Sequence, residues 1–487
     1  MTNLDRRAFL RRASSSAALV ATPSSLSGLV AACARTDGAG RMVLRNEPPR
    51  YARLGEGGYG PLTVDTGELL LPAGFEARAF GRVGDRMEDG NRTPIAHDGM
   101  AAFPWMGDRV RLVRNQEVAN LAGFGPPLAE RAYDPLAGGG TTTLELTADN
   151  ELVADWVSLS GTAVNCAGGP TPWGSWLSCE ETVVGRSEGF ERTHGWIFEV
   201  PVAARGPVEP VPLTAMGRFQ HEAIAVDPRT GIVYETEDNG FDPDQARPGS
   251  GLYRFLPERP GELASGGRLQ VACVRGEPGL QLFRGTGGGM GIGSTFPIVW
   301  ADLDMVDPDP EDRMSYPVRR GALFEHGLTK GAAAFSRLEG CWHAEGRVVF
   351  HDTGGGAAGS GHVWEYTPGR AEGAGGGDDV GSLRLLFESP GPEVLDGPDN
   401  ITVSPRGGIV LCEDPRGRPF LRGLTPDGAI FDFAMNNLNE SEFAGATFSP
   451  DGRTLFCNIQ GSTRGSVDDA PPGVTLAIRG EWERGAL

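Results

Sequence analysis

Short runs of alternating apolar and polar positions recur along the chain, and turns rich in Pro and Gly separate them. Residues 221–238 hold one such run, the turn Asp-Pro-Arg-Thr-Gly, a second apolar run, and the acids Glu237 and Asp238. Residues 399–414 repeat the pattern, and weaker copies lie at 165–181, 337–352 and 442–458. A two-residue period with such turns is typical of antiparallel hairpins. The pattern therefore predicts an all-β protein built from repeated hairpins.

Hairpins repeated along one chain favour a β-propeller, because closure of the blades into a ring protects the sheet edges. At roughly 40 to 70 residues per blade we predict six blades. Residues 60–487 are expected to form this single propeller domain, with strands at 68–71 and 474–478 sharing the blade that closes the ring. The 73 Gly and 37 Pro suit many short strands joined by tight turns.

Polar residues flank the hairpins, and hairpin geometry predicts where they meet. The residue before the first strand and the residue after the second lie at the same end, so repetition around a ring gathers them at one mouth of the channel. So many acids would repel one another unless cations neutralise them, which predicts a polynuclear metal site. The alternative is that each pair caps its own turn. The candidates are Asn165, Cys166, Cys179, Glu180, Glu222, Glu237, Asp238, Glu339, Asp352, Asp399, Glu413 and Asp414.

The charge of the chain excludes some partners. A formal charge of −20 and a pI near 4.9 repel phosphate backbones and anionic membranes, so nucleic-acid binding is not expected. Clustered carboxylates favour hard cations such as calcium. The six cysteines beyond Cys33 are widely spaced in a large domain, which is not the pattern of a disulfide framework. Ligand roles and buried-strand roles compete for them.

The first 33 residues have the pattern of an export signal. Residues 5–10, Asp-Arg-Arg-Ala-Phe-Leu, match the twin-arginine signature, and a weakly apolar stretch follows at 17–32. We expect an exported protein, periplasmic or on the cell surface, with the twin-arginine translocase as a partner. The box Val-Ala-Ala-Cys that ends at Cys33 predicts either a lipid anchor on that cysteine or ordinary cleavage after Ala32. Residues 34–59 are expected to form a tether.

Several of these segments resemble the PhoX family of twin-arginine-exported alkaline phosphatases. The similar segments cover nearly all of the mature chain in order, and the long segment 165–182, Asn-Cys-Ala-Gly-Gly-Pro-Thr-Pro-Trp-Gly-Ser-Trp-Leu-Ser-Cys-Glu-Glu-Thr, is the most specific of them. The others lie at 138–143, 158–162, 217–222, 236–238, 335–340, 399–400, 412–414 and 443–452. The resemblance implies a six-bladed propeller that acts as a monomer on small phosphate monoesters.

The resemblance also implies a cofactor of paired Fe³⁺ ions with several calcium ions at the channel mouth. A cysteine thiolate on iron is carried over to Cys179 or, as second choice, Cys166, which agrees with the preference of thiolates for iron over calcium. Arg337 is expected to clamp the phosphate, with Glu222 and Glu339 as catalytic carboxylates that bind metal, and Asn115 as a second phosphate contact. The further metal ligands expected are Asp414, Glu413, Asp399, Glu117, Glu180 and Glu237.

The reaction implied is metal-assisted hydrolysis of phosphate monoesters, with no serine nucleophile. One position departs from the family pattern, because Gln116 stands where members commonly have histidine in Asn-His-Glu. Two other functions fit a propeller of this composition. A calcium-dependent propeller hydrolase acting on lactones or phosphotriesters would need fewer ligands and no cysteine on a metal. A non-catalytic binding module is favoured if Gln116 marks a lost activity.

Overall fold

The computed structural model describes residues 34–36, 42–44, 58–118, 122–123, 128–245, 247–377, 379–468 and 471–487. The chain divides into two compact units, 1–48 and 49–487. In the first unit, β1 (Ala34–Thr36) and β2 (Met42–Leu44) form an antiparallel pair within the segment expected to be a tether. The twin-arginine segment and Cys33 lie outside the described residues. Within the described residues, no helix is long and apolar enough to cross a membrane.

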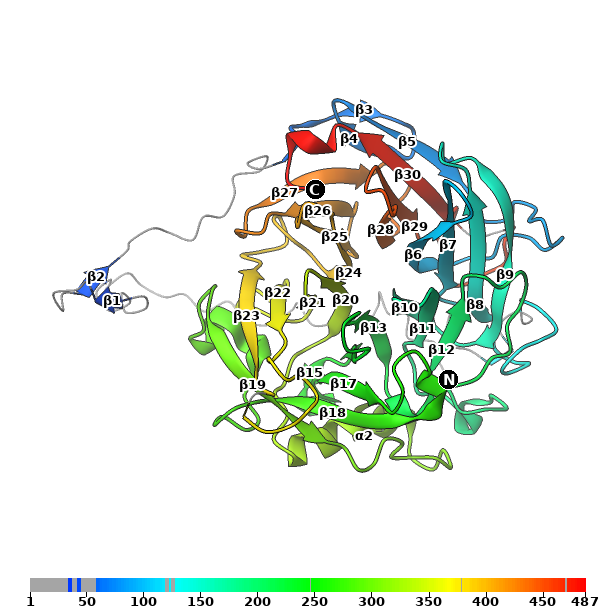
Figure 1. Ribbon diagram of the computed structural model, residues 1–487. Coiled ribbons are helices and arrows are strands. Elements are labelled where there is room, and N and C mark those ends of the chain that lie inside the picture. The colour runs from blue at the N-terminus through cyan, green and yellow to red at the C-terminus, as the bar shows by residue number, and fades with distance from the viewer. Residues whose placement is uncertain are drawn as a thin grey trace. The chain divides into compact units, whose positions relative to one another are not determined.

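The second unit is a β-propeller, as the sequence predicts (Figure 1). Six strands surround its centre, and each lies beside the next in a closed ring. Each of them pairs with the following hairpin strand and so starts a sheet that runs outward. In ring order the six inner strands are β6 (His97–Trp105), β10 (Asn165–Pro170), β13 (His221–Val226), β20 (Leu338–Ala344), β24 (Pro398–Val403) and β28 (Phe443–Phe448).

Outside the inner strands, antiparallel neighbours follow in the order of the chain. The second strands are β7 (Arg109–Gln116), β11 (Ser175–Glu180), β14 (Val233–Glu237), β21 (Arg347–Asp352), β25 (Ile409–Glu413) and β29 (Thr454–Ile459). The third strands are β8 (Gly139–Leu146), β12 (Ile197–Pro201), β17 (Leu252–Pro257), β22 (His362–Thr367), β26 (Phe420–Leu424) and β30 (Val474–Gly480). The outer strands are β9 (Leu152–Thr162), β18 (Gly267–Val274), β23 (Gly381–Glu388), β27 (Ile430–Asn436) and β5 (Phe75–Phe80).

The outer strands join some of these sheets, so blades and sheets do not coincide. β19 (Thr295–Asp302) pairs with both β18 and β23, which produces one nine-stranded sheet. In a separate sheet, β4 (Leu69–Pro72) pairs with β27 and β3 (Leu62–Asp65) pairs with β4. The sheet that starts at β24 therefore has six strands. Six blades, one for each inner strand, remains the interpretation that the ring supports.

The ring closes by a different strand from the one predicted. The stretch 68–71 was expected beside 474–478, but the strand in that stretch, β4, pairs with β27 instead. The partner of β30 is β5, whose Ala77 faces Ile478 in the register. The turn at 73–74 separates β4 from β5, so two consecutive early strands join two neighbouring blades. The N-terminal strand thereby completes the blade made by the C-terminal hairpin.

The remaining elements are short or lie at the ends of the blades. β15 (Phe241–Asp242) and β16 (Arg247–Pro248) form a small hairpin after β14, and α2 (Tyr316–Thr329) precedes β20. The helix starts after Ser315 with a proline in its first turn, which suits a helix N-terminus. The 3₁₀ turns are η1 (Arg186–Glu188), η2 (Thr214–Met216), η3 (Pro243–Gln245), η4 (Leu263–Ser265), η5 (Leu282–Gly288) and η6 (Trp482–Arg484).

Apolar side chains fill the spaces between neighbouring blades. One core lies at the ring closure, where Tyr59, Phe433 and Trp482 pack edge to face or tilted against one another. The Tyr59 hydroxyl accepts a hydrogen bond from the amide of Leu487 at 3.0 Å and donates to the carbonyl of Trp482 at 3.0 Å. These contacts fix the C-terminal end against the residue that leads into β3. The inner strands are thereby held in a closed and rigid ring.

Candidate metal centre

The same irregularity occurs near the start of all six inner strands. In each, one extra residue interrupts the pairing with the second strand, as between His97 and Met100 of β6 or between Asn165 and Gly168 of β10. The other four interruptions follow His221, Leu338, Pro398 and Ala444. A bulge of this kind bends the strand and redirects a side chain, and bulges are common beside active sites. The repeat therefore aims one residue per strand at the same place.

The residue directly after the last regular pair is chemically distinctive in five of the six strands. It is Asp98 in β6, Cys166 in β10, Glu222 in β13, Glu339 in β20 and Asp399 in β24. In β28 the equivalent residue is Gly445, whose φ of 60° is in the left-handed region that favours glycine. Glu442, just before that strand, supplies the acid on this side of the ring.

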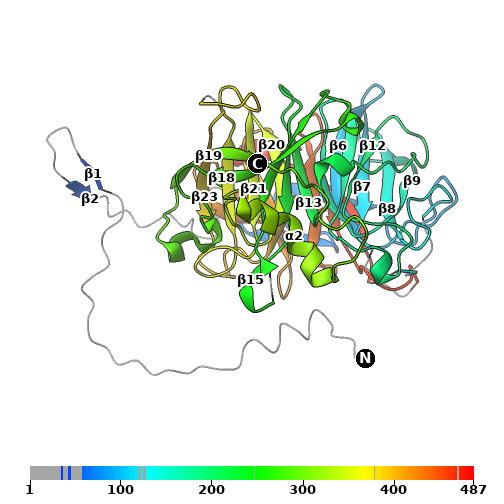
Figure 2. The same cartoon turned by 90° about the horizontal axis from the view of Figure 1, so that it is seen from below.

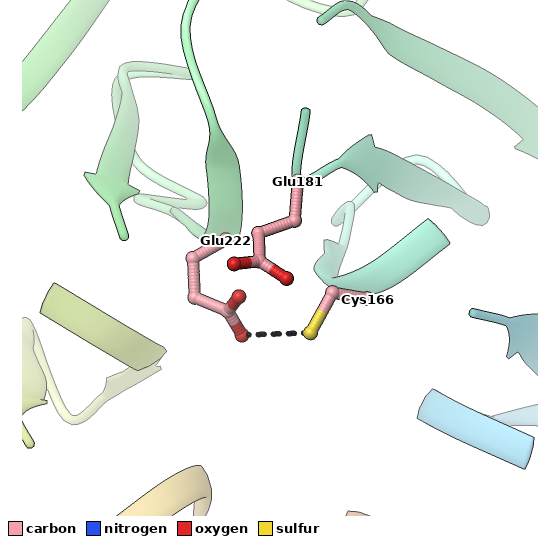
Figure 3. Close-up of side chains that lie close together, drawn as sticks. All are labelled: Cys166, Glu181 and Glu222. Carbon is pink, nitrogen blue, oxygen red and sulfur yellow. Dashed lines mark hydrogen bonds between the residues drawn. The ribbon is translucent and has the colours of Figure 1, made fainter. Parts of the chain in front are cut away.

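Two of these residues, together with one that follows a second strand, meet in the group drawn in Figure 3. One ligand atom from each of Cys166, Glu181 and Glu222 lies within 4.8 Å of the others. The Cys166 Sγ donates to Glu222 Oε1 at 3.3 Å, and it lies 3.9 Å from Asp98 Oδ1. Glu181 directly follows β11, so both ends of the hairpin β10–β11 contribute to the group. A group that contains a thiol as well as carboxylates suits an iron ion better than a calcium ion, because calcium prefers oxygen ligands only.

Two further groups adjoin the first. Glu222 also approaches Glu339 and Asp399, again with one oxygen from each residue within 4.8 Å of the others. The third group contains Asp98, Glu117 and Glu442. Gln460 joins two members of this third group, because its Nε2 donates to Asp98 Oδ2 at 2.7 Å and to Glu117 Oε2 at 2.7 Å. Shared residues and short distances thus make the three groups one acidic centre, the mouth cluster.

Burial and mutual repulsion dominate the electrostatics of the mouth cluster. Burial raises the pKa of Glu222 well above its usual value, and the charges of Glu339 and Asp399 raise it further. Burial also raises the pKa of Asp399, to about 7, with Asp414 the next cause. The pKa of the Cys166 thiol is raised by burial and then by Asp98. Carboxylates in this arrangement ionise together only when cations offset their charge. The geometry and the charge therefore both fit bound metal ions.

The guanidinium group of Arg337 lies at the edge of the mouth cluster. Its Nε donates to Asp238 Oδ1 at 3.1 Å and its Nη2 to Glu339 Oε1 at 2.6 Å. Its backbone has φ 60°, which is uncommon outside glycine and costs of order 1 kcal/mol or more. Backbone hydrogen bonds to Asn239 and from Thr353 hold this conformation. The expected proximity of Arg337 and Glu339 is confirmed, and the guanidinium side chain remains one-third exposed.

Three of the predicted ligands point away from the mouth cluster, and each accepts hydrogen bonds from other parts of its blade, although Oε1 of Glu237 has no partner among the described residues. Glu180 accepts from His194 Nδ1 at 2.6 Å and from three backbone amides. Glu237 accepts from the Tyr253 hydroxyl and from the amide of Gly251. Glu413 binds Arg422 Nε at 2.8 Å and two amides. These carboxylates fasten the following strands and loops.

Side-chain alternation explains why one acid of each adjacent pair lies at the mouth and the other does not, where the sequence favoured Glu180 over Glu181 and named both members of the pairs 237–238 and 413–414. Glu180 is the register partner of Asn165, and cross-strand partners share one face of a sheet. Successive side chains point to opposite faces, so Cys166 and Glu181 lie on the other face, toward the channel. The same parity applies to Asp238 and Asp414, which follow Glu237 and Glu413. The residue after the second strand, rather than its last residue, belongs to the mouth.

Two further predictions are corrected in the same way. Cys179, the first choice for the thiolate, is buried in an apolar core with Leu177 and Ile197, while Cys166 lies in the mouth cluster. Asn115 was expected to contact phosphate, but its amide donates to the carbonyls of Cys166 and Ala167 at 3.0 and 2.7 Å. Its Oδ1 accepts from Trp176 and Ser178. Asn115 therefore positions the strand that carries Cys166.

Some of the other candidates from the sequence lie in the mouth cluster and some lie outside it. Asn165 accepts a hydrogen bond from Thr162 at the end of β9 and donates one to Ser178 in its own blade, and Asp352 forms an ion pair with His362. Glu117 lies in the third group as predicted, and Gln116, at the position that departs from the family pattern, donates to Thr142 outside the groups. Asp98, Glu181 and Glu442 are candidate ligands that were not predicted from the sequence. The acid or cysteine at the second position of five of the six inner strands was the signal that could have found Asp98.

Comparisons with known proteins identify the family and the fold of the chain. The family model of alkaline phosphatase PhoX matches residues 57–154 and 147–462. Among solved structures, Pseudomonas fluorescens PhoX in complex with vanadate, a transition state analogue, is similar with a TM-score of 0.65 and 18% identity, over 88% of this chain and 99% of that chain. A gluconolactonase from Xanthomonas campestris has a TM-score of 0.39 and 15% identity, over 85% and 99% of the chains. A search of curated proteins found no match.

Proposed function

The chain belongs to the PhoX family of alkaline phosphatases and is a phosphoric monoester hydrolase, and from this premise we propose that it acts through iron and calcium bound in the mouth cluster. The observation that carries the proposal is the convergence of Cys166, Glu181 and Glu222 with two further acidic groups. A thiolate favours iron, and the purely carboxylate groups favour calcium. The Pseudomonas fluorescens protein, solved with vanadate, supports a phosphoryl-transfer centre in this fold.

The donor sets suggest how the metals divide. Cys166, Glu181 and Glu222 would hold iron, and Glu222 with Glu339 and Asp399 would hold a second ion beside it. Asp98, Glu117 and Glu442 form an all-oxygen group suited to calcium. Binding of iron would require loss of the Cys166 proton that is donated to Glu222, so metal affinity is expected to rise with pH. Once bound, the cluster would neutralise charge on the phosphoryl oxygens and supply Lewis acidity for the displacement.

The protein side chains have their own parts in the reaction. Arg337 presents a planar guanidinium that matches two phosphoryl oxygens, and Asp238 holds its plane at the mouth. Glu339 touches both Arg337 and the Glu222–Asp399 group, so it links phosphate binding to metal binding. Gln460 and Asn115 position ligands without joining the groups. We expect substrate to enter at this mouth, where Asp414 is exposed.

The rival functions predict different chemistry. A calcium-dependent lactone or phosphotriester hydrolase needs no cysteine ligand, so the placement of Cys166 among carboxylates favours the phosphatase. A binding module without activity was suggested by Gln116, but the Gln116 amide binds Thr142 away from the mouth cluster. The departure from the family pattern therefore leaves all three acidic groups intact. We propose a small phosphate monoester as substrate and a monomer as the active form.

We also propose that the protein is exported by the twin-arginine translocase to the periplasm or the cell surface. The support is residues 5–10 and the box ending at Cys33, which offers a lipid anchor. Export of a folded protein suits an enzyme that loads metal inside the cell. Fractionation of cells making the wild type and an Arg6→Lys, Arg7→Lys variant tests export, and the variant is expected to stay in the cytoplasm.

Hydrolysis assays on one protein preparation test the proposed reaction. Turnover of p-nitrophenyl phosphate, of gluconolactone and of paraoxon is measured before chelation, after chelation, and after iron and calcium are restored. The proposal predicts release from the phosphate monoester alone, lost with the metals and regained when both return. Turnover of the lactone or the triester in place of the monoester, or binding of phosphate without turnover, would support one of the rivals.

A further inference from the structure

Helix α2 and the hairpin β15–β16 lie together beside the channel mouth. The hairpin follows β14 directly after Asp238, and the segment after α2 leads to Arg337 at the start of β20. α2 contacts β16, and Figure 2 shows α2 beside β15. A Cβ added to Gly321 would lie only 2.8 Å from Pro248 Cδ, so the helix and the hairpin touch with no space between them. The two elements form one wall of the mouth.

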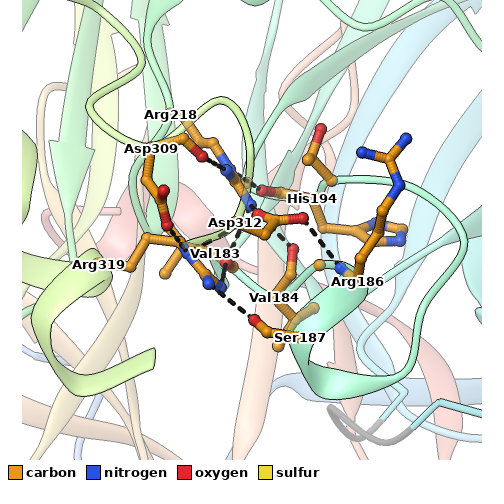
Figure 4. A network of polar contacts seen from close by, with 12 residues as sticks. Val183, Val184, Arg186, Ser187, His194, Arg218, Asp309, Asp312 and Arg319 are labelled. Carbon is orange, nitrogen blue, oxygen red and sulfur yellow. Dashed lines mark hydrogen bonds and ion pairs between the residues drawn. The ribbon is translucent and has the colours of Figure 1, made fainter. Parts of the chain in front are cut away.

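The network drawn in Figure 4 fixes the helix in that wall. Arg319 donates from Nε to Asp309 at 2.8 Å and from its terminal nitrogens to the Val183 carbonyl at 3.0 Å and the Ser187 hydroxyl at 2.8 Å. Arg218 binds Asp312 at 2.7 Å in the same network. Buried and fully bonded arginines of this kind hold segments rigidly. α2 is thereby tied to the loop that follows Glu181 of the mouth cluster.

The next residue of α2 is an arginine of the opposite character. Among the described residues Arg320 forms no hydrogen bond or ion pair, and its Nε is buried without a partner. Tyr316 lies one turn earlier on the same face and bonds to Thr182, beside Glu181. The side chain of Arg320 therefore lies on the face of α2 that is turned toward the mouth. An unpartnered buried guanidinium nitrogen is costly, so it indicates a missing anionic or polar partner.

A second unpaired arginine lies on the hairpin. In the described part of the chain Arg247 of β16 also lacks an ion pair. Burial lowers its pKa, and the positive charges of Arg320 and Arg337 lower it further, against the opposing effects of Asp242 and Asp238. Arg247 thus lies within electrostatic reach of both Arg320 and Arg337. Asp238 is already bonded to Arg337, so it does not neutralise all three.

A buried amide completes this group. Asn239 is fully buried, and neither its Nδ2 nor its Oδ1 has a partner in the described structure. The Nδ2 lies 3.6 Å from the Cβ position of Gly321, directly after Arg320. Its backbone carbonyl accepts from the amide of Arg337, so the same residue shapes the clamp and faces the wall. Two unpaired arginines and an unpaired amide donor are a donor set for an anion.

We propose that Arg247, Arg320 and Asn239 form a second anion subsite beside Arg337, which selects phosphate monoesters whose alcohol part carries another negative charge, a carboxylate or a second phosphate. The inference rests on the proposed phosphatase function and names its substrate class. The reacting phosphate takes the mouth cluster and Arg337, while the second anion lies against the wall of α2 and β16. This assignment accounts for a cluster of three arginines in a protein whose net charge is −20.

Two substrates that differ in one group test the subsite. Glycerol 3-phosphate and 3-phosphoglycerate differ only in a neutral hydroxymethyl and a carboxylate, and kcat/KM is measured for both. The wild type is expected to prefer 3-phosphoglycerate by about tenfold, the worth of one charge-assisted contact. Arg320→Gln and Arg247→Gln are each expected to remove most of that preference, with kcat/KM for glycerol 3-phosphate changed by less than about threefold. Arg313→Gln, which removes the same charge from an exposed side chain, is the matched control.

The outcomes separate this inference from the function on which it rests. Equal use of the two substrates by the wild type, or an equal loss on both in the variants, would overturn the subsite while leaving the phosphatase intact. Absence of p-nitrophenyl phosphate turnover in the wild type would overturn the proposed function itself. Thermal unfolding of each variant checks its fold. Arg247→Gln lies on a surface hairpin and carries the test if Arg320→Gln unfolds.

Discussion

Cys166 Sγ and Glu222 Oε1 lie 3.3 Å apart, and each belongs to the equivalent position of neighbouring inner strands, just beyond the bulge. The contact brings a thiol and a carboxylate together inside a ring of further acids. Burial and the charges of Asp98 and Glu222 raise the pKa of the thiol, so the free protein keeps it protonated. A bound cation would reverse that preference. The pair is therefore expected to lose its shared proton when a metal ion binds.

The two cysteines of the segment 165–182 offer a matched test of this relationship. Cys166→Ser is expected to lower the iron content and to reduce kcat/KM for p-nitrophenyl phosphate on the order of 100-fold, because a hydroxyl is a poor replacement for a thiolate. Cys179→Ala removes a thiol from the apolar core and should cost about 1 kcal/mol of stability with metal content unchanged. Elemental analysis and kinetics on both variants measure this. Equal iron loss in the two would contradict the assignment.

Neighbouring glutamates provide a second comparison. Glu181→Gln is expected to reduce bound metal and activity while the fold is kept, because Glu181 lies in the mouth cluster. Glu180→Gln is expected to lower the stability of the fold while the folded protein keeps its metal. The reason is that Glu180 accepts a hydrogen bond from buried His194 and from three amides. Breaking a buried charged network of this kind costs about 3 kcal/mol or more of stability. Urea unfolding and metal analysis separate the two effects. A stable but metal-depleted Glu180→Gln protein would refute the side-chain parity argued above.

Arg337 is expected to act by its shape as well as its charge. Arg337→Lys keeps the charge but loses the planar fork, so kcat/KM should fall by roughly 100-fold with metal content unchanged. Inhibition by vanadate should weaken in parallel, because the same oxygens are bound. The Arg313→Gln variant again controls for loss of surface charge elsewhere. A lysine variant with normal kinetics would show that Arg337 only balances Asp238 and Glu339.

The stability of the protein should fall at alkaline pH because of a buried histidine. His362 lies between Asp352 and Glu388, and although burial alone would lower it, their charges and hydrogen bonds raise its pKa to about 9. The stabilisation is complete below the unfolded pKa near 6.5 and is lost as pH rises through about 9. At most this is about 3 kcal/mol, from about 1.4 kcal/mol per pKa unit.

Unfolding in urea across pH 6 to 10 measures this dependence. His362→Gln is expected to reduce the slope in that range, and His194, whose pKa is also raised to about 9 by Glu180 and Asp134 against the opposing effect of burial, is expected to supply the slope that remains. The wild type should unfold more readily at pH 10 than at pH 6. The same slope in the wild type and His362→Gln would assign the pH dependence to other groups.

The repeated hairpins were sufficient to predict the propeller and the location of its site. Alternation and turn residues are local properties, so the pairs around Glu222 and Asp399 could be recognised without any knowledge of the ring. The proximity of Arg337 and Glu339 followed from their spacing alone and is confirmed at 2.6 Å. The prediction of which strand closes the ring was wrong, because the choice between β4 and β5 as partner of β30 depends on long-range packing.

The candidate ligands were harder to predict from the sequence, and Glu180 and Glu181 illustrate the reason. Which of two adjacent acids faces the channel depends on where the strand ends and on a one-residue bulge, and boundaries are the least certain part of any sequence argument. Cys166 and Cys179 posed the same problem, since both lie in strands and only register distinguishes them. Asp98 was missed because its hairpin lacks the flanking acidic pair that marked the others.

The most direct test of the account is the metal content and phosphatase activity of one preparation of the exported protein, for the wild type and Cys166→Ser. The account predicts iron and calcium in the wild type, with p-nitrophenyl phosphate turnover that chelation removes and both metals restore, and loss of iron with turnover in the variant. Wild-type protein that hydrolyses the ester without either metal, or a variant that keeps both iron and activity, would contradict the central claim.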